Sequence, residues 1–112
     1  KITDVKALEL EVFKETSLFP DVAENCMSTA FAHIFQGGYS SGYYSYKWAE
    51  VLDADAFEYF KEHGIFNKII STKFKDSVLS KGGTRDPMFL YEKFRGQKPK
   101  TKALLRRAGL LN

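Results

Sequence analysis

The 112-residue sequence has few of the features that mark secreted or membrane proteins. It contains one cysteine, Cys26, so no disulfide can form within the chain. Nothing in it resembles a signal peptide, and its apolar runs are only a few residues long, too short to span a bilayer. We therefore expect a cytoplasmic protein with no membrane partner.

Acidic residues are missing from one segment of the chain, residues 93–107, which holds seven Lys and Arg. A basic cluster of this kind can bind phosphates. However, the segment has no aromatic residue for stacking beyond Phe94, and the formal net charge of the whole chain is only +3. We interpret the segment as a solvated helix and loop, and we expect no nucleic-acid partner.

The sequence also lacks the motifs of a metal site. HExxH is absent, and the only histidines are His33 and His63. Cys26 lies seven residues before His33, which is one face of a helix, but two ligands do not make a zinc site. No metal ligand is predicted in this chain.

Helical spacing of apolar residues runs through most of the sequence, and no alternating strand of useful length occurs. The predicted fold is all-α. Asp4 lies near the start of the first predicted helix. The other helix ends follow from Asn67 and either Thr84 or Asp86 as N-terminal caps, Pro87 as a first helical residue, and glycines at the C-terminal ends. The predicted helices cover residues 3–15, 22–35, 41–64, 67–79, 87–95 and a short segment after Pro99.

The stretch HIFQGGYSSGYYSYKW, residues 33–48, combines aromatic residues with glycines. On the helix predicted from residue 41, one face carries Tyr43, Tyr46 and two carboxylates, whereas Tyr44 and Trp48 follow an apolar stripe and are predicted to pack in the core. The glycine loop before the helix is either a structural turn or a substrate-closing device. His33, at the end of the preceding helix, is by itself more typical of a capping or packed residue than of a catalytic one.

The same stretch resembles a signature of the thimet oligopeptidase family of zinc metallopeptidases, through its H-x5-Y-x3-Y-x2-Y spacing and glycine loop. The resemblance covers essentially all 112 residues and is nearest to the bacterial peptidyl-dipeptidase and oligopeptidase A members. Further along the chain it rests on the segments EHGIFN, LSKGGTRDPMFLYEKFRG and ALLRRAGL. Arg85 departs from the pattern, because an acidic residue is expected at that position.

The resemblance implies a mostly helical catalytic domain that hydrolyses short peptides and binds zinc through HExxH and a distal glutamate. These ligands are expected upstream of the segment present here. Residues 1–112 are therefore expected to be the C-terminal segment of the catalytic domain, partnered by the remainder of that domain. On its own the segment is expected to be inactive and to expose apolar surface through which it self-associates.

The resemblance also implies roles for individual residues. His33 is similar to a histidine that hydrogen-bonds the substrate backbone, and Tyr46 to a tyrosine that donates its phenol to the oxyanion. Tyr39 is similar to a second tyrosine that contacts substrate, and Tyr43 to one that lines the cleft. Gly37, Gly38 and Gly42 match the flexible glycine loop. The alternative function is a non-catalytic helical module that binds peptides.

Overall fold

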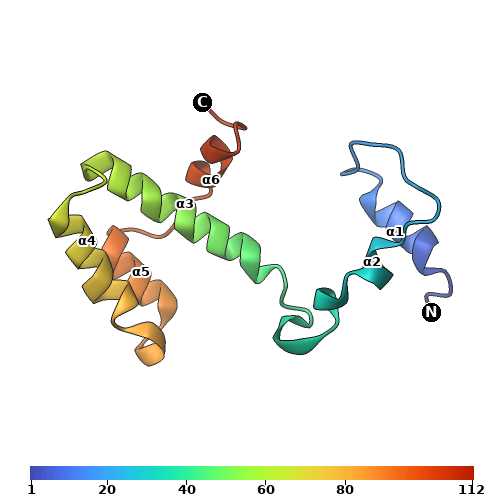
Figure 1. The fold of residues 1–112 in the computed structure, drawn as a ribbon, viewed down its shortest axis with the longest axis horizontal. Helices are drawn as coiled ribbons and strands as arrows, with labels where there is room; N and C mark the ends of the chain where they lie inside the picture. Colours follow the sequence, from blue (N-terminus) through green and yellow to red (C-terminus); the bar gives the residue numbers. More distant parts are fainter. The chain divides into compact units, whose positions relative to one another are not determined.

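A computed structural model describes residues 1–112 as two compact units, Lys1–Tyr44 and Ser45–Asn112 (Figure 1). Each unit is built only from helices and turns, so the all-α prediction is confirmed. None of the helices combines the length and apolar character needed to cross a bilayer.

The first unit contains helices α1 (Val5–Phe13) and α2 (Met27–Ala30), followed by the 3-10 turns Ala32–Ile34 and Gly37–Tyr39. The helix predicted over residues 3–15 is present but shorter, and it starts at Val5 because the Asp4 side chain caps it, accepting a hydrogen bond of 2.9 Å from the backbone N–H of Ala7.

The prediction of one helix over residues 22–35 is wrong. Helix α2 begins only at Met27 and is interrupted at Phe31, whose backbone (φ −90°, ψ 79°) is outside the helical region. The carboxylate of Glu9, buried on α1, accepts the N–H groups of Met27 at 3.0 Å and Ser28 at 2.7 Å. This contact satisfies the first free N–H groups of α2 and fixes its start.

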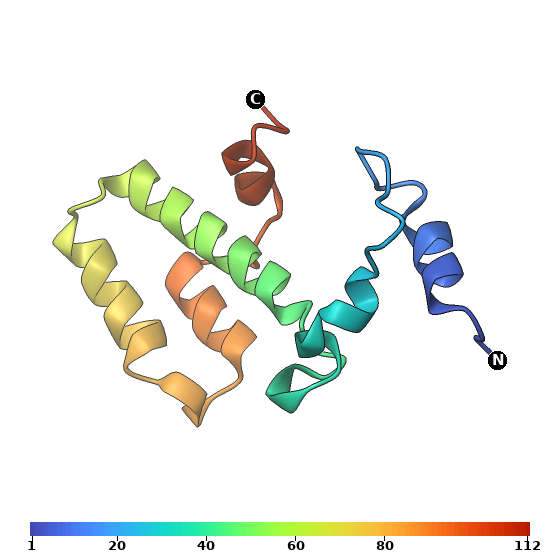
Figure 2. The ribbon, with the colours of Figure 1, turned by 45° about the vertical axis from the view of Figure 1, so that its right-hand side comes forward.

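The second unit contains one long helix and several shorter ones. Within it α4 and α5 lie side by side, and α6 packs along α3 (Figures 1 and 2). A π-helical turn, Lys75–Leu79, continues α4, so the helix predicted over residues 67–79 has a widened last part. The helices are α3 (Ser45–His63), α4 (Lys68–Phe74), α5 (Pro87–Arg95) and α6 (Lys102–Arg107).

The helix ends of the second unit confirm most of the capping predictions. Asn67 accepts hydrogen bonds from the N–H groups of Ile69 and Ile70, and Asp86 accepts one of 3.0 Å from Phe89, with Pro87 in the first position of α5. Gly96 has φ 81°, the left-handed conformation that ends a helix most readily at glycine.

The core of the second unit is centred on Phe94 of α5, which is fully buried. Its ring lies 4.9 Å from that of Phe74 and 5.3 Å from that of Tyr59, both in edge-on geometry. Rings at these distances and angles attract each other in addition to burying apolar area. The cluster joins α3, α4 and α5, and it also includes Ala56, Ile70, Tyr91, Leu52, Phe60 and Val78.

The prediction that Tyr44 and Trp48 pack in the core is wrong in this chain, where 67% and 57% of these residues are exposed. The buried stripe of α3 starts with Val51, because the elements that pack on this helix cover it only from there onward. Helical periodicity identified the apolar stripe, but it could not show at which residue of the stripe other elements begin to pack on it.

Candidate functional site

Three of the predicted site residues form an aromatic cluster in the first unit. The ring of His33 lies 5.6 Å from that of Tyr39 and 5.9 Å from that of Tyr43, and the two tyrosine rings are 6.2 Å apart. Phe31 extends the cluster, because its ring lies 4.7 Å from the ring of Tyr43 in edge-on geometry. The imidazole is exposed, Tyr39 is 39% exposed and Tyr43 is half-buried, so the cluster is anchored but accessible to a ligand.

The glycine loop produces this cluster by folding back on the turn that carries His33. The backbone N–H of Ser41 donates to the carbonyl of Ile34 at 3.4 Å, and that of Gly42 to the carbonyl of Tyr39 at 2.8 Å. Gly37 has φ 63°, a conformation that glycine adopts without steric cost. Tyr43 is thereby brought back toward His33, which lies ten residues earlier in the chain.

Tyr43 does not lie on the helix face predicted for it. Helix α3 begins at Ser45 rather than near Ser41, so Tyr43 belongs to the preceding turn and to the first unit. This position lets the phenol contact His33 instead of the carboxylates of α3. Those carboxylates are ion-paired with other residues: Glu50 with Lys47 at 2.8 Å and Asp53 with Arg107 at 2.5 Å.

Tyr46 is the second residue of α3 and is 47% exposed. It belongs to the second unit, whereas His33, Tyr39, Tyr43 and the three loop glycines belong to the first. The structure therefore brings together three of the four predicted aromatic site residues within one unit.

The cluster of His33, Tyr39 and Tyr43 suits hydrogen bonding to a polar substrate. Imidazole can donate through one nitrogen and accept through the other, and the hydroxyl of a phenol can donate a hydrogen bond. Across residues 1–112, no three His, Cys, Asp or Glu side chains gather closely enough to hold a metal ion. The zinc implied by the resemblance therefore does not fit the residues present, and no step is assigned to it.

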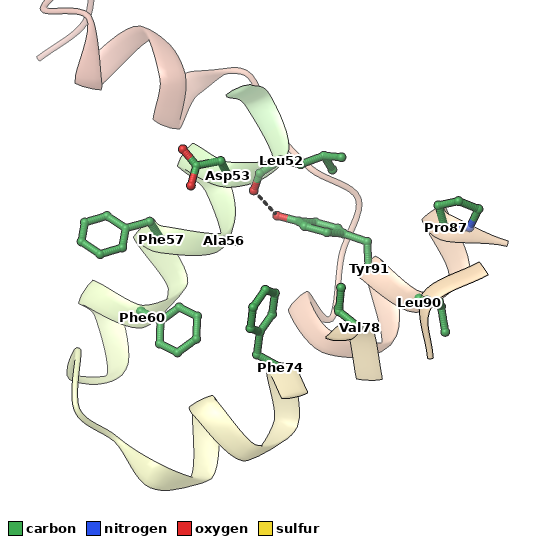
Figure 3. A pocket seen from close by; sticks show the side chains of 11 residues that line it. Leu52, Asp53, Ala56, Phe57, Phe60, Phe74, Val78, Pro87, Leu90 and Tyr91 are labelled. Carbon is green, nitrogen blue, oxygen red and sulfur yellow. Dashed lines mark hydrogen bonds between the residues drawn. The ribbon is translucent and has the colours of Figure 1, made fainter. Parts of the chain in front are cut away.

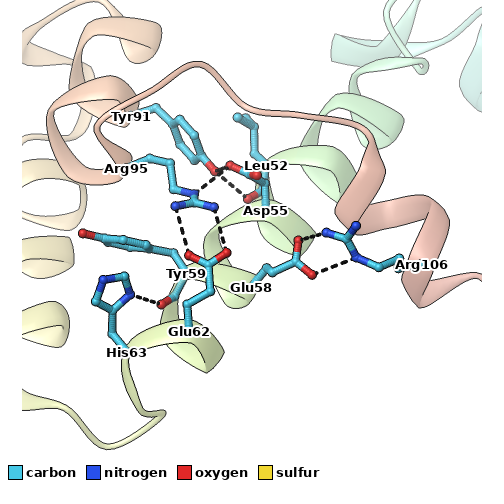
Figure 4. A network of polar contacts seen from close by, with 9 residues as sticks. All are labelled: Leu52, Asp55, Glu58, Tyr59, Glu62, His63, Tyr91, Arg95 and Arg106. Carbon is cyan, nitrogen blue, oxygen red and sulfur yellow. Dashed lines mark hydrogen bonds and ion pairs between the residues drawn. The ribbon is translucent and has the colours of Figure 1, made fainter. Parts of the chain in front are cut away.

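A buried polar network that sequence analysis missed joins α3 to α5 (Figure 4). Asp55 is only 2% exposed, and its Oδ2 accepts hydrogen bonds from the Tyr91 hydroxyl at 2.6 Å and from Arg95 Nε at 3.3 Å. Burial, together with this hydrogen bond, raises the pKa of Tyr91 well above its ordinary value. In the sequence, Asp55 lies on the apolar stripe of α3. That position was the one signal that this acidic residue is buried.

Arg95 reaches further partners from the same position. Its guanidinium lies 4.6 Å above the ring of Tyr59, and its two terminal nitrogens each lie 3.4 Å from a carboxylate oxygen of Glu62. Arg106 on α6 forms a second, two-bond ion pair with Glu58, which lowers the pKa of that carboxyl. Part of the basic segment is therefore occupied in holding helices together.

An apolar groove runs between α3, the π-helical turn and α5 (Figure 3). It encloses about 490 Å³, and the rings of Phe57, Phe60 and Phe74 line one part of it. Asp53 and Tyr91 are the lining residues whose side chains carry polar groups. The remaining lining residues are Leu52, Ala56, Val78, Gly82, Pro87 and Leu90.

Comparison with known proteins connects these features to one family. The model of peptidase family M3 matches residues 2–110. The chain is 54% identical over 83 residues to oligopeptidase A of Haemophilus influenzae, covering 74% of this chain and 12% of that protein. It is 46% identical over 100 residues to oligopeptidase A of Escherichia coli, covering 89% and 15%. It is 35% identical over 108 residues to the dipeptidyl carboxypeptidase of Escherichia coli, covering 96% and 16%.

Proposed function

The chain belongs to peptidase family M3, and we propose that it is the C-terminal segment of a zinc-peptidase catalytic domain that hydrolyses short peptides. It spans only 12% to 16% of the length of the curated relatives described above. The zinc and its ligands would belong to the remainder of the domain, and the 112-residue chain by itself would not cleave peptides.

The observation that supports this proposal is the cluster of His33, Tyr39 and Tyr43. In the proposed role the imidazole hydrogen-bonds the substrate backbone beside the scissile bond. Tyr39 contacts the substrate and the intermediate from the glycine loop, and Tyr43 lines the cleft. The ring separations of 5.6 to 6.2 Å allow one extended peptide backbone to meet all three side chains.

Tyr46 is proposed to donate its phenol to the oxyanion that forms when the peptide carbonyl is attacked. A preplaced donor of this kind typically stabilises the transition state by roughly 3 to 4 kcal/mol. The hydroxyl is effective because it donates without carrying a charge into the site. Gly37, Gly38 and Gly42 are proposed to let the loop that carries Tyr39 adjust to the substrate.

The remainder of the catalytic domain is the partner proposed for the exposed apolar surface of this chain. Phe66 is 96% exposed and Ile69 is 78% exposed, and the groove beside Phe57 and Phe60 is open. Exposed apolar area on this scale is typical of a surface that another protein segment covers. Without that cover, the isolated chain is expected to self-associate.

Peptide binding by the 112-residue chain tests the proposal directly. We expect a short unmodified peptide to shift the NMR signals of the His33 ring and of the Tyr39 and Tyr43 side chains in a saturable manner, and His33→Ala to weaken binding. Tyr44→Phe is the matched control, because Tyr44 is adjacent in sequence and exposed but has no proposed role.

Saturable binding that is insensitive to His33→Ala would contradict the assignment of the cluster. Binding by the chain together with no hydrolysis by an intact protein containing it would favour the alternative, a non-catalytic peptide-binding module.

A further inference from the structure

Positive charge is concentrated in the second unit. Residues 45–112 contain fourteen Lys and Arg and eight Asp and Glu, a formal net charge of +6, whereas residues 1–44 carry −3. Most of the acids are already engaged: Asp86 caps α5, and six others form ion pairs. Few carboxylates remain to neutralise the other cations.

Three of these cations line one concavity. It lies between the π-helical turn Lys75–Leu79, the turn that follows it and α5, and it encloses about 650 Å³. Lys81, Arg85 and Lys93 all contribute to its wall. None of the three is within ion-pair distance of an acidic side chain in this chain.

Two hydroxyl groups accompany the cations. Ser77 is only 5% exposed and lines the same concavity. Ser77 belongs to the π-helical turn, a rare conformation that is frequent at functional sites. Thr84 supplies the second hydroxyl.

We propose that this pocket binds a phosphate-bearing anion. A phosphate group carries up to two negative charges and several acceptor oxygens, so it can engage three cations and the Ser77 hydroxyl together, whereas one carboxylate has a single charge. The planar guanidinium of Arg85 can bind two oxygens of a phosphate at once.

The test is titration of the 112-residue chain with inorganic pyrophosphate at low ionic strength, followed by calorimetry and by the amide NMR signals of residues 77–93. We expect saturable binding with shifts concentrated at Ser77 and residues 82–84, weakened by added salt. Lys81→Gln with Arg85→Gln should weaken binding by at least about tenfold, and Ser77→Ala by about threefold.

The matched control is Lys68→Gln with Lys98→Gln, which removes the same charge from exposed positions that do not line the pocket. Each variant is first checked for an unchanged circular dichroism spectrum. Equal weakening by the control pair, or no saturable binding at millimolar pyrophosphate, would overturn the proposal.

Two further ligands, titrated in the same way, show which kind of anion the pocket prefers. Glycerol 3-phosphate binding more tightly than pyrophosphate would support the proposal and point to a phosphate ester, and the reverse order to an inorganic anion. An Asp-Asp dipeptide binding about tenfold more tightly than either would overturn it in favour of carboxylates. No peptide hydrolysis is measured, so these outcomes do not depend on the peptidase assignment.

Discussion

The difference between Asp55 and Asp53 offers a direct test of how α3 is held in the second unit. Both are aspartates on the same helix, and both pair with an arginine from the C-terminal part of the chain. Asp55 and Arg95 have side chains that are only 3% and 10% exposed, whereas those of Asp53 and Arg107 are 67% and 45% exposed. The two substitutions to alanine should therefore differ strongly in their effect on stability.

Asp55→Ala leaves the Arg95 guanidinium without its buried partner and the Tyr91 hydroxyl with only a long contact to the Leu52 carbonyl at 3.4 Å. Breaking a buried ion pair by removing one member costs about 3 to 5 kcal/mol of unfolding free energy. Removing only the Tyr91 hydroxyl by Tyr91→Phe should cost about 1.5 to 3 kcal/mol, since it loses one hydrogen bond to a charged group. Asp53→Ala breaks a solvated ion pair and should cost at most about 1 kcal/mol.

The assay is urea denaturation of each variant at neutral pH, followed by circular dichroism at 222 nm. The free energies of unfolding are compared by using one common dependence on urea concentration (m value) for all variants. Equal losses for Asp53→Ala and Asp55→Ala would refute the argument that burial determines the strength of these pairs. A loss below 1 kcal/mol for Asp55→Ala would show that the network around Arg95 does not hold α5 on α3.

Other substitutions test the core, the cap on α2 and the glycine loop. Phe94→Ala empties the centre of the second unit and should cost about 3 to 5 kcal/mol in the same urea assay; a loss near zero would contradict that core. The Ser28 and Met27 N–H groups lower the pKa of Glu9 to about 2, so its stabilising contribution is present above about pH 4.5 and is lost as the pH falls toward 2. Glu9→Gln should remove this pH dependence, which the NMR signals of α2 report. Gly37→Ala should destabilise the loop by about 1 kcal/mol, because residue 37 has a φ of 63° that alanine adopts only with strain, whereas Gly38→Ala should be tolerated. The NMR signals of the His33 ring report the effect of each variant on the loop. Equal effects of the two variants would contradict the loop geometry.

Helix ends were largely predictable from the sequence, because capping depends on residues close together in the chain. Asn67, Asp86 and Gly96 each act within a few residues of their own position. The second helix was not predictable in this way. Its start at Met27 depends on Glu9, which is 18 residues away, and no local pattern carries that information.

The candidate site was predictable in part. The resemblance identified His33, Tyr39 and Tyr43, and the structure brings their rings together, while their proposed roles stay predictions. Periodicity failed for Tyr43 because the start of α3 was set four residues too early. The pairing of Asp55 with Tyr91 and Arg95 joins residues 36 and 40 positions apart, which only the packing of α5 on α3 reveals.

The most direct test of the central claim is the rate of peptide hydrolysis by an intact family M3 protein that contains this segment. If Tyr46 donates to the oxyanion, Tyr46→Phe should lower kcat roughly 100- to 1,000-fold with little change in KM, and Tyr44→Phe should leave both unchanged. An unchanged kcat for Tyr46→Phe would contradict the claim that these residues form the oxyanion-stabilising wall of a peptidase.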